Sequence, residues 1–501
     1  MSLYETVNIP QLNITYEQPL GLFINNEFVK SSDGKKIESI NPSTEESIVS
    51  FFAASEKDVN SAVTAARDAF ENNWSKTSGE QRGILLSKLF DLIERDKLLL
   101  AAIETLDSGK PYHSNSLADL EQILQLTRYY AGGADKFTGG EYIPLNQDKY
   151  AYTMKVPYGV VAQIVPWNYP LAMASWKIQS CLAAGNTIVI KPAENTSLSL
   201  LYFAQLVKEA GFPPGVLNIL PGYGSVTGTA MASHTDIDKI AFTGSTAVGQ
   251  KVMSLAAQSN LKAVTLECGG KSPCLIFADA NLDEAIPWVA GGIFYNSGQN
   301  CTANSRIYVH EDIYEEFLTK FEEYAKSNWK FGAKFDPFDK DCTLGPVISK
   351  VQYDRIQSYV EHGKASEKLG FKEFAEYPSK GYFIPPTIFS DVPNSSKLSQ
   401  EEIFGPVGVV ASFSTYEEAI KLANDSSYGL ASCVFSENAR TTAQFARDIR
   451  AGTVWINSSN DEEISVPFGG FKMSGIGREL GRNGVDSYLQ TKAVHVNIAK
   501  L

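Results

Sequence analysis

Between residues 159 and 267 the sequence alternates short β-branched runs with amphipathic stretches, and this alternation restricts the possible folds most strongly. The intervening stretches carry apolar residues at helical spacing, and two of them end at Gly185 and Gly211, the residue type that commonly terminates a helix. Repeated strand–helix–strand units indicate right-handed crossovers and a parallel, doubly wound α/β sheet, which binds ligands at the carboxyl ends of its strands. The predicted strands are GVVAQIV (159–165), NTIVI (186–190), VLNIL (216–220), KIAFT (239–243) and AVTLE (263–267).

A second alternating series begins near Cys274 and predicts a second α/β domain. Its runs are CLIFAD, SRIYVH, VGVVASF, LASCVFS and TVWIN. The segments 141–157 and 485–501 fit neither series, and their alternating pattern predicts extended strands. Because long unpaired strand edges promote aggregation, we expect these segments to pair with each other or with another subunit.

Composition and charge exclude several classes of function. The 44 Lys and Arg residues against 57 Asp and Glu leave a net charge of −13, and no basic block suggests a nucleic-acid partner. Six scattered cysteines fit free thiols in a reducing compartment, and five distant histidines predict no metal site. Since the sequence contains neither a membrane-spanning apolar run nor a signal-peptide pattern, we expect a cytoplasmic protein without membrane contact. The C-terminal Ala499-Lys500-Leu501 approximates a peroxisomal signal, which leaves the peroxisome as an alternative location.

Two motifs contain side chains suited to covalent catalysis. Cys301 in FYNSGQNCTANS (294–305) is surrounded by small polar residues, where a nucleophilic thiol could meet oriented backbone N–H groups. Glu267 in LECGGKSP ends a predicted strand, where partial desolvation would poise its carboxylate as a general base. Each residue also has a purely structural interpretation: a buried inert cysteine at a tight corner, and a solvated glutamate entering a turn.

Three further segments suggest a nucleotide cofactor. Thr243-Gly-Ser-Thr-Ala-Val-Gly249 joins a predicted strand to a helix, whose free N-terminal N–H groups could bind a pyrophosphate; simple helix capping is the alternative. The G-x-G-x-x-G fingerprint is absent there, and Gly222-Tyr-Gly224 lacks its third glycine. Lys191 and Glu194 follow a strand and could hold the adenosine ribose, where a carboxylate would repel a 2′-phosphate and favour NAD over NADP. In PWNYP (166–170), Asn168 could donate its amide to an oxyanion.

Taken together and in this order, the motifs resemble those of the aldehyde dehydrogenase superfamily, in its hydrolytic NAD(P)-dependent class and closest to the fungal cytosolic enzymes. The resemblance covers nearly the whole chain and also includes KPAE, FTGSTAVG, EEIFGPV (401–407) and PFGGFKMSGIGRE (467–479). It implies a Rossmann-like NAD-binding domain (1–138 and 159–267), an α/β catalytic domain (268–480) and oligomerisation strands (139–158 and 485–501). A homotetramer or homodimer is expected, and Gln490 leaves the choice open because many relatives carry Glu there.

The resemblance also implies residue roles. Cys301 would attack the aldehyde, Asn168 would stabilise the oxyanion, Glu267 would activate the hydrolytic water, and Lys177 and Glu479 would relay its proton outward. The expected contacts with NAD are Ile164, Pro166, Trp167, Lys191, Glu194, Gly224, Gly244, Ser245, Val248, Gly249, Cys268, Gln352, Glu402 and Phe404.

The substrate funnel is expected to combine an apolar wall with an acidic mouth. Its implied members are Tyr169, Met173, Trp176, Gln122, Tyr295, Thr302, Glu462 and Phe468. Glu462 falls where aliphatic-aldehyde enzymes often carry an aromatic residue, and Asp119 and Glu121 lie on the facing helix. An acidic rim favours an aldehyde with a distal cation, such as 3-aminopropanal. The alternatives are a solvated acidic loop on a broad-specificity aliphatic aldehyde dehydrogenase, an enzyme that transfers its acyl group to coenzyme A or phosphate, and a non-catalytic protein on the same scaffold.

Overall fold

The predicted alternation forms the parallel centre of an eight-stranded sheet in the computed structural model, which describes residues 2–331, 336–371 and 380–499. The spatial order β13-β12-β9-β10-β11 places the first strand of the series at the centre, so the winding reverses between β9 and β12. Such a reversal point is where doubly wound sheets bind ligands. The strands are β9 (Val160–Ile164), β10 (Thr187–Lys191), β11 (Leu217–Ile219), β12 (Lys239–Thr243) and β13 (Ala263–Glu267).

Helices cover both faces of this sheet because neighbouring strand residues point to opposite sides. Val161 and Ala241 belong to the core under one helical layer, and Val160 and Ile240 belong to the core under the other. The expected doubly wound fold is therefore confirmed. The first layer contains α2 (Gly79–Ser108), α3 (Leu117–Gly133), α4 (Pro170–Ala184) and α5 (Leu198–Ala210), and the second contains α1 (Glu56–Asn72), α6 (Thr229–Ser233) and α7 (Thr246–Ser259).

The edges of the first sheet come from distant parts of the chain. β3 (Leu22–Ile24) and β4 (Glu27–Val29) extend it beyond β11, and β21 (Gly475–Ile476) pairs antiparallel with β13. β21 lies within the range expected for the catalytic domain, yet it completes the first sheet directly beside Glu267. Two antiparallel pairs that the sequence did not predict lie nearer the N-terminus: β1 (Tyr4–Ile9) with β2 (Ile14–Pro19), and β5 (Lys36–Ile40) with β6 (Ser47–Phe52).

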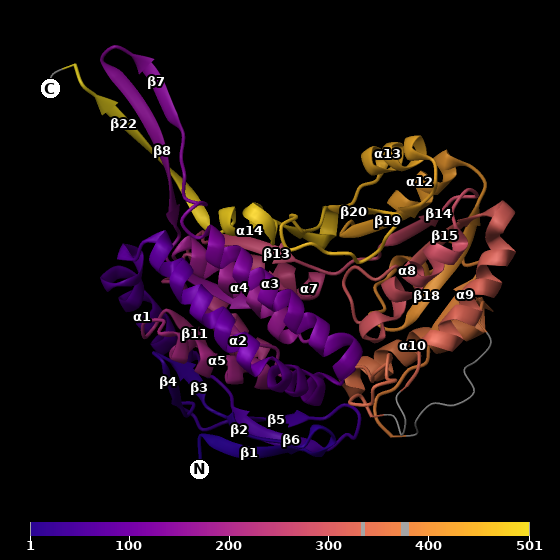
Figure 1. The fold of residues 1–501 in the computed structure, drawn as a ribbon, viewed down its shortest axis with the longest axis horizontal. Helices are drawn as coiled ribbons and strands as arrows, with labels where there is room; N and C mark the ends of the chain where they lie inside the picture. Colours follow the sequence, from indigo (N-terminus) through magenta and orange to yellow (C-terminus); the bar gives the residue numbers. More distant parts are fainter. Residues whose placement is uncertain (1, 332–335, 372–379, 500–501) are drawn as a thin grey trace.

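The second predicted series forms a seven-stranded sheet, which lies beside the part of the molecule built on the eight-stranded sheet (Figure 1). Its strands, in spatial order, are β16 (Lys368–Leu369), β17 (Thr387–Ser390), β18 (Val407–Phe413), β15 (Arg306–His310), β14 (Pro273–Ile276), β19 (Ala431–Phe435) and β20 (Thr453–Ile456). Its helices are α8 (Leu282–Phe294), α9 (Tyr314–Asn328), α10 (Lys350–Ser366), α11 (Lys397–Gln400), α12 (Tyr416–Asn424) and α13 (Ala439–Asp448).

The two unassigned segments form a three-stranded arm that projects from the body (Figure 1). β22 (Leu489–Asn497) pairs with β8 (Lys149–Pro157), which pairs with β7 (Tyr142–Asn146), so the segments do pair with each other. The strand expected from residue 485 begins later, because α14 (Gly481–Asp486) buries Val485 in the first core. Lys500 and Leu501 of the C-terminal tripeptide lie outside the described residues. Among the helices that the structure describes, none has the length and apolar character needed to cross a bilayer.

Candidate active site

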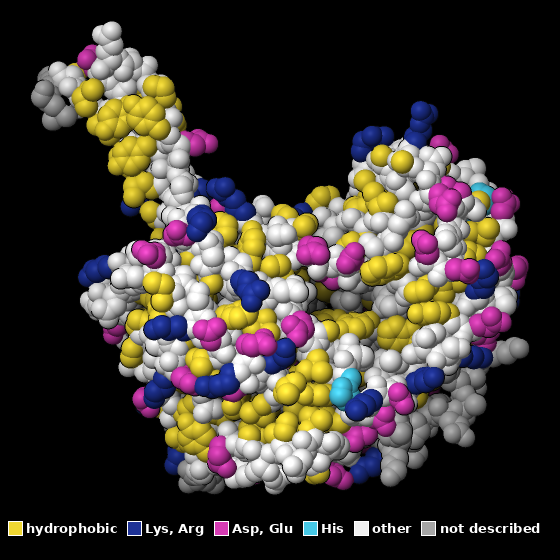
Figure 2. All heavy atoms as spheres, viewed as in Figure 1, with side chains coloured by type: hydrophobic (Ala, Val, Ile, Leu, Met, Phe, Trp, Pro, Cys, Tyr) yellow, Lys and Arg dark blue, Asp and Glu magenta, His cyan; other side chains and the backbone are white. Residues whose placement is uncertain are grey.

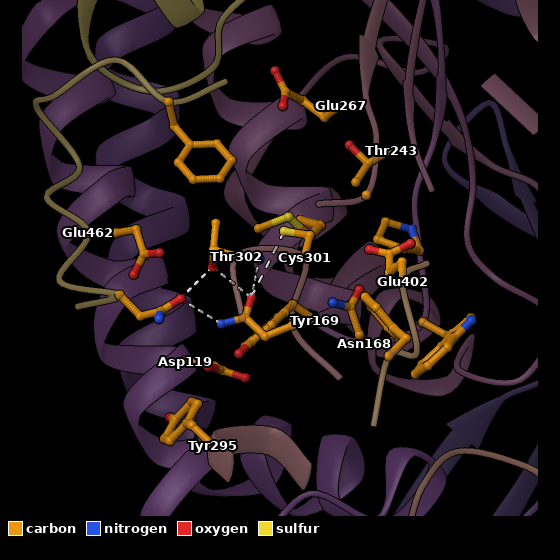
Figure 3. A pocket seen from close by; sticks show the side chains of 18 of the residues that line it. Asp119, Asn168, Tyr169, Thr243, Glu267, Tyr295, Cys301, Thr302, Glu402 and Glu462 are labelled. Carbon is orange, nitrogen blue, oxygen red and sulfur yellow. Dashed lines mark hydrogen bonds between the residues drawn. The ribbon is translucent and has the colours of Figure 1, made fainter. Parts of the chain in front are cut away.

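A cavity of about 610 Å³ lies at the carboxyl ends of β9, β12 and β13 and is closed by loops of the second sheet. Cys301, Glu267 and Asn168 all line it, although they come from three separate segments of the chain (Figure 3). The topological reversal between β9 and β12 therefore lies at this cavity.

The loop that carries Cys301 is tightly built. Asn296 and Ser297 have φ of 52° and 55°, which turns the chain sharply between α8 and the thiol. Asn168 is fastened to this loop: its Nδ2 donates to the Gln299 carbonyl at 2.9 Å, and its own carbonyl accepts from Asn296 Nδ2 at 2.9 Å. One N–H of the amide expected to bind an oxyanion is thus committed to holding the Cys301 loop, and the second N–H is left for a ligand.

Glu267 ends β13 with both carboxyl oxygens buried and without a hydrogen-bond partner among the described residues. Next to it lies a buried ion pair between Lys177 and Glu479, and Lys177 Nζ also donates to Thr243 Oγ1 at 2.6 Å. Because β12 and β13 are parallel and in register, Thr243 stands directly opposite Glu267. The structure therefore gathers Glu267, Lys177 and Glu479 on the same face of the sheet, beside the cavity.

Gly269 and Gly270, which follow Glu267 and Cys268, allow Glu402 and the Cys301 loop to approach the backbone closely. A Cβ at Gly269 would lie 2.2 Å from Glu402 Oε2, and one at Gly270 would lie 2.5 Å from the Cys301 carbonyl oxygen. The Gly270 N–H also donates to Glu402 Oε1 at 3.0 Å. Any side chain at either position would separate the Glu267 strand from the Cys301 loop and from Glu402.

Burial dominates the electrostatics of the cavity. Burial raises the pKa of the Cys301 thiol well above its usual range, and the carboxyls of Glu402, Glu462 and Glu267 raise it further. The pKa of Glu267 is raised by burial and by Glu479, while Lys177 and Arg478 oppose the shift. Burial and the neighbouring carboxyls therefore favour the protonated form of both groups.

The expected cofactor side has free backbone N–H donors and an ion pair between Lys191 and Glu194. Ser245 is the N-cap of α7, but its side chain makes no capping hydrogen bond, so the N–H groups of the first helical turn remain available. The Ser245 hydroxyl therefore does not cap α7 in this structure. Lys191 Nζ lies 3.2 Å from Glu194 Oε2, and the Trp167 and Phe404 rings meet edge to face at 5.3 Å. Burial raises the pKa of Glu402 to about 7.

Of the residues expected to contact NAD, eight line the cavity: Pro166, Trp167, Gly244, Ser245, Cys268, Gln352, Glu402 and Phe404. The other six are outside its lining: Ile164, Lys191, Glu194, Gly224, Val248 and Gly249. Gly224 and Glu194 nevertheless lie together, since the Gly224 N–H donates to Glu194 Oε1 at 3.4 Å. Lys191, Glu194 and Gly224 thus form one group beyond the end of β10, outside the cavity that the other eight residues line.

All eight residues expected in the substrate funnel line the same cavity: Tyr169, Met173, Trp176, Gln122, Tyr295, Thr302, Glu462 and Phe468. Trp176 is held from two sides, by Gln122 Oε1 at 3.1 Å from its Nε1 and by the Phe468 ring at 5.3 Å. The Tyr169 ring lies beneath Lys110, whose Nζ is 3.9 Å from the ring centre. The funnel is therefore an apolar wall with its aromatic rings fixed in place.

The acidic mouth is smaller than expected. Glu121 does not line the cavity, and its carboxylate lies 2.8 Å from Lys97 Nζ on the protein surface. Asp119 does line the cavity, but it forms a buried ion pair with Lys110. Of these three carboxylates, Glu462 alone faces the cavity without a cationic partner in the described part of the chain, and burial raises its pKa to about 7 (Figure 3). Glu462 is thus less exposed than Asp461 and Glu463 on either side of it.

Several cavity residues escaped sequence reasoning. Asn460 Oδ1 accepts from the Thr302 hydroxyl and from Asn300 Nδ2, and so ties the loop after β20 to the Cys301 loop. Arg355 Nη2 donates to the Glu402 carbonyl at 2.7 Å, and it follows Gln352 by three residues on α10, so helical spacing could have revealed it. Trp288, on α8, gave no sequence signal. The described residues contain no cluster of His, Cys, Asp and Glu suited to a metal ion.

Comparisons with known proteins agree with this geometry. A family model described as "Aldehyde dehydrogenase family" matches residues 28–494. The chain is 68% identical to a Saccharomyces cerevisiae protein named aldehyde dehydrogenase (NAD(P)+) 1, over 99% of each chain. Its fold is similar to the NAD+ complex of an aldehyde dehydrogenase from Bacillus cereus, with a TM-score of 0.93 and 46% identity over 99% of this chain and 100% of that one. A betaine aldehyde dehydrogenase from Staphylococcus aureus matches with a TM-score of 0.92 and 38% identity over 97% of this chain and 96% of that one.

Proposed function

Since the chain belongs to the aldehyde dehydrogenase family, we propose that it oxidises an aldehyde to the carboxylate by covalent catalysis at Cys301, with NAD as the electron acceptor. The observation that carries this proposal is the meeting of Cys301, Glu267 and Asn168 in one cavity at the reversal point of the sheet. Coenzyme-A- or phosphate-dependent acyl transfer is disfavoured, because an acyl group kept for another acceptor gains nothing from a base that activates water.

In the first stage, the Cys301 sulfur adds to the aldehyde carbon and forms a thiohemiacetal. The Cys301 backbone N–H and the second N–H of Asn168 stabilise the oxygen on which charge develops; one such donor commonly contributes about 3 kcal/mol to the transition state. When bound, NAD supplies the acceptor for the hydride that leaves this carbon. The hydroxyl proton leaves at the same stage, and Cys301 retains the acyl group as a thioester.

In the second stage, Glu267 takes a proton from water, whose oxygen attacks the thioester carbon and releases the carboxylic acid and the Cys301 thiolate. The thiolate recovers its proton from the carboxylic acid, so the proton on Glu267 is the one that must leave this stage. The overall balance is one aldehyde, one NAD+ and one water giving carboxylate, NADH and two protons. Lys177 and Glu479 lie beside Glu267 and are proposed to take its proton onward. A buried carboxyl with a raised pKa is suited to this role, because it holds a proton readily and must have neighbours that remove it.

The residues described above fit NAD. The first turn of α7 would bind the pyrophosphate, Lys191 and Glu194 the adenosine ribose, and Glu402 the nicotinamide ribose, with Trp167 and Phe404 bounding the ring. The Glu194 carboxylate, held by Lys191, would repel a 2′-phosphate, which supports a preference for NAD over NADP.

For the substrate we propose an aldehyde with a distal cation, such as 3-aminopropanal. Glu462 supports it, because its carboxyl enters the apolar cavity and can accept an ammonium group. The Staphylococcus aureus neighbour acts, by its name, on betaine aldehyde, which carries a quaternary ammonium group. The competing candidate is a broad-specificity aliphatic enzyme, favoured by the apolar wall of Met173, Trp176 and Phe468.

Comparing kcat/KM for 3-aminopropanal and propanal, both with NAD, distinguishes the two candidates. A clear preference for 3-aminopropanal supports the cationic substrate, and parity or a preference for propanal rejects it. Absence of NADH formation with both aldehydes would reject the catalytic proposal as a whole.

We also propose that the arm mediates assembly into a homodimer or homotetramer. Apolar side chains crowd its surface (Figure 2), and Tyr142 and Leu145 on β7 are 67% and 52% exposed. Both β7 and β22 are edge strands that a second copy could extend.

The free thiols of Cys268 and Cys301 fit the reducing cytoplasm as the location.

A further inference from the structure

A layer of polar side chains continues from Glu267 along the first sheet, away from the substrate cavity. In the parallel register of β12 and β13, Lys239, Ala241 and Thr243 stand opposite Ala263, Thr265 and Glu267. These six residues point to the same face of the sheet, because side chains alternate along each strand. Lys239 Nζ donates to Thr265 Oγ1 at 3.1 Å, and Lys177 Nζ donates to Thr243 Oγ1 at 2.6 Å. Two buried lysines thus reach one face of the same two strands.

This layer is buried beneath α4 and contains acceptors that protein groups do not satisfy. Lys177 is fully buried and Lys239 is 1% exposed. The Gln163 side chain lies on the same face of β9, where its Oε1 and both Glu267 oxygens have no partner among the described residues. Buried acceptors of this kind are hydrogen-bonded to internal water in folded proteins. These three oxygens are therefore acceptors that internal water can satisfy.

The far end of the layer opens into a second cavity of about 420 Å³. Lys239 and Thr265 line it together with Tyr158, Asn483 and Asp486. It has no lining residue in common with the substrate and cofactor cavity. Lys239 therefore lies between the surroundings of Glu267 and a separate solvent-exposed opening.

The proposed reaction needs such an opening. Each turnover releases two protons, and the acyl group held on Cys301 lies inside the main cavity while the thioester is hydrolysed. We propose that Lys239, assisted by Thr265, carries protons from the Glu267–Lys177–Glu479 group to the second cavity, so that protons leave by a route separate from substrate and cofactor. This proposal rests on the proposed role of Glu267 as the base.

The charges around Lys239 suit proton transfer rather than a fixed ion pair. Among the described residues no carboxylate lies within ion-pair distance of Lys239, and its ammonium lies over the rings of Tyr488 at 5.3 Å and Tyr158 at 5.7 Å. Burial lowers the pKa of Lys239 to about 8, with Cys181 and Glu479 opposing the shift and Lys177 adding to it. The charged or titratable groups that face it are Lys177 and Cys181 on α4, Glu479, Arg478, Asp486 and Tyr488 on the C-terminal segment, and Tyr158 before β9.

The test compares Lys239→Met with Lys262→Met as a matched control. Lys262 is also buried, but its Nζ donates to the Ala232 carbonyl and to Ser259, away from the polar layer. In K239M we expect the first turnover of NADH to be retained, while steady-state kcat falls about tenfold. Imidazole small enough to enter the second cavity should restore much of this loss. K262M should show neither the loss nor the rescue.

The pH dependence gives a second, independent readout. Lys239 accepts a proton only when it is neutral, so kcat limited by proton exit should rise with pH through about 8 in the wild type and lose this limb in K239M. Thr265→Val keeps the side-chain shape and should give a smaller loss with the same rescue, which covers the case in which K239M folds poorly.

Two results separate the possible failures. An unchanged kcat and pH profile in both K239M and T265V, or a loss that imidazole does not restore in either, would overturn the proton route. Absence of NADH formation in the wild type with any aldehyde would instead refute the proposed catalytic role of Cys301 and Glu267.

Discussion

Replacing Glu462 by Gln removes one charge from the cavity and keeps the shape of the side chain. Glu462 is partly exposed, enters the cavity from the loop after β20, and has a pKa raised to about 7 by burial. If it binds the cationic end of the substrate, E462Q should lower kcat/KM for 3-aminopropanal and leave kcat/KM for propanal nearly unchanged.

The expected size follows from Coulomb's law. An ammonium about 5 Å from a carboxylate at an effective dielectric constant of about 20 is attracted by about 3 kcal/mol. Because Glu462 is open to the cavity mouth, screening reduces this to about 1.4 kcal/mol, which is a factor of about ten. The ratio of the two kcat/KM values should therefore fall about tenfold in E462Q.

The same carboxyl makes the ratio depend on pH. The aldehyde's amine remains protonated across this range, since a lysine-like ammonium titrates near pH 10. Glu462 has a raised pKa of about 7, so its charge is present above that pH and is lost below it. The wild-type preference for 3-aminopropanal should increase between pH 6 and pH 8, whereas that of E462Q should stay flat.

Steady-state NADH formation at 340 nm with both aldehydes, measured at saturating NAD, supplies these ratios. Glu463→Gln is the matched control, because Glu463 is exposed and lies outside the cavity lining. Equal effects of E462Q and E463Q, or a pH-independent wild-type ratio, would refute the direct contact between Glu462 and the substrate cation.

Further perturbations address the other parts of the proposal. Glu267→Gln should retain a burst of about one NADH per active site in stopped-flow absorbance while steady-state turnover falls about 100-fold; loss of the burst as well would contradict its assignment to hydrolysis. Glu194→Gln should raise kcat/KM with NADP severalfold and lower it with NAD, because the repulsion of a 2′-phosphate is removed; an unchanged ratio would place the ribose elsewhere. Leu145→Asp on the arm should shift the molar mass from light scattering to a smaller species with activity per subunit measured alongside; an unchanged mass would rule out this face of the arm as an assembly surface.

The parallel strands could be predicted because they are buried on both faces, which produces nearly continuous apolar runs. All five residues of β9 and of β10 are buried, and their observed ends differ by one residue from the predicted ones. β1, by contrast, exposes most of its residues and is held by pairing with β2. β1 could not be predicted from its own residues, because its stability comes from pairing with β2 and not from an apolar pattern of its own.

The site shows the same division. Cys301 and Glu267 belong to distinctive motifs, but the Lys110–Asp119 ion pair joins the segment after α2 to α3 and neutralises a carboxylate expected at the funnel mouth. Glu121 could have been excluded in advance, because residues two apart on a helix face nearly opposite directions, whereas Gln122 shares the cavity face with Ala118. Ion pairs between different segments thus determine the charge of the funnel mouth. Such pairs cannot be predicted from the sequence pattern of one helix.

The nucleophile and its two helpers belong to separate sheets: Cys301 precedes β15, while Asn168 follows β9 and Glu267 ends β13. Their alignment depends on a few hydrogen bonds across the boundary, such as that from Asn168 to the Gln299 carbonyl. Mild denaturant that loosens this boundary should stop turnover while the circular dichroism of both halves is still intact. The enzyme is thus expected to lose activity when the boundary between the two sheets loosens, before either sheet itself unfolds.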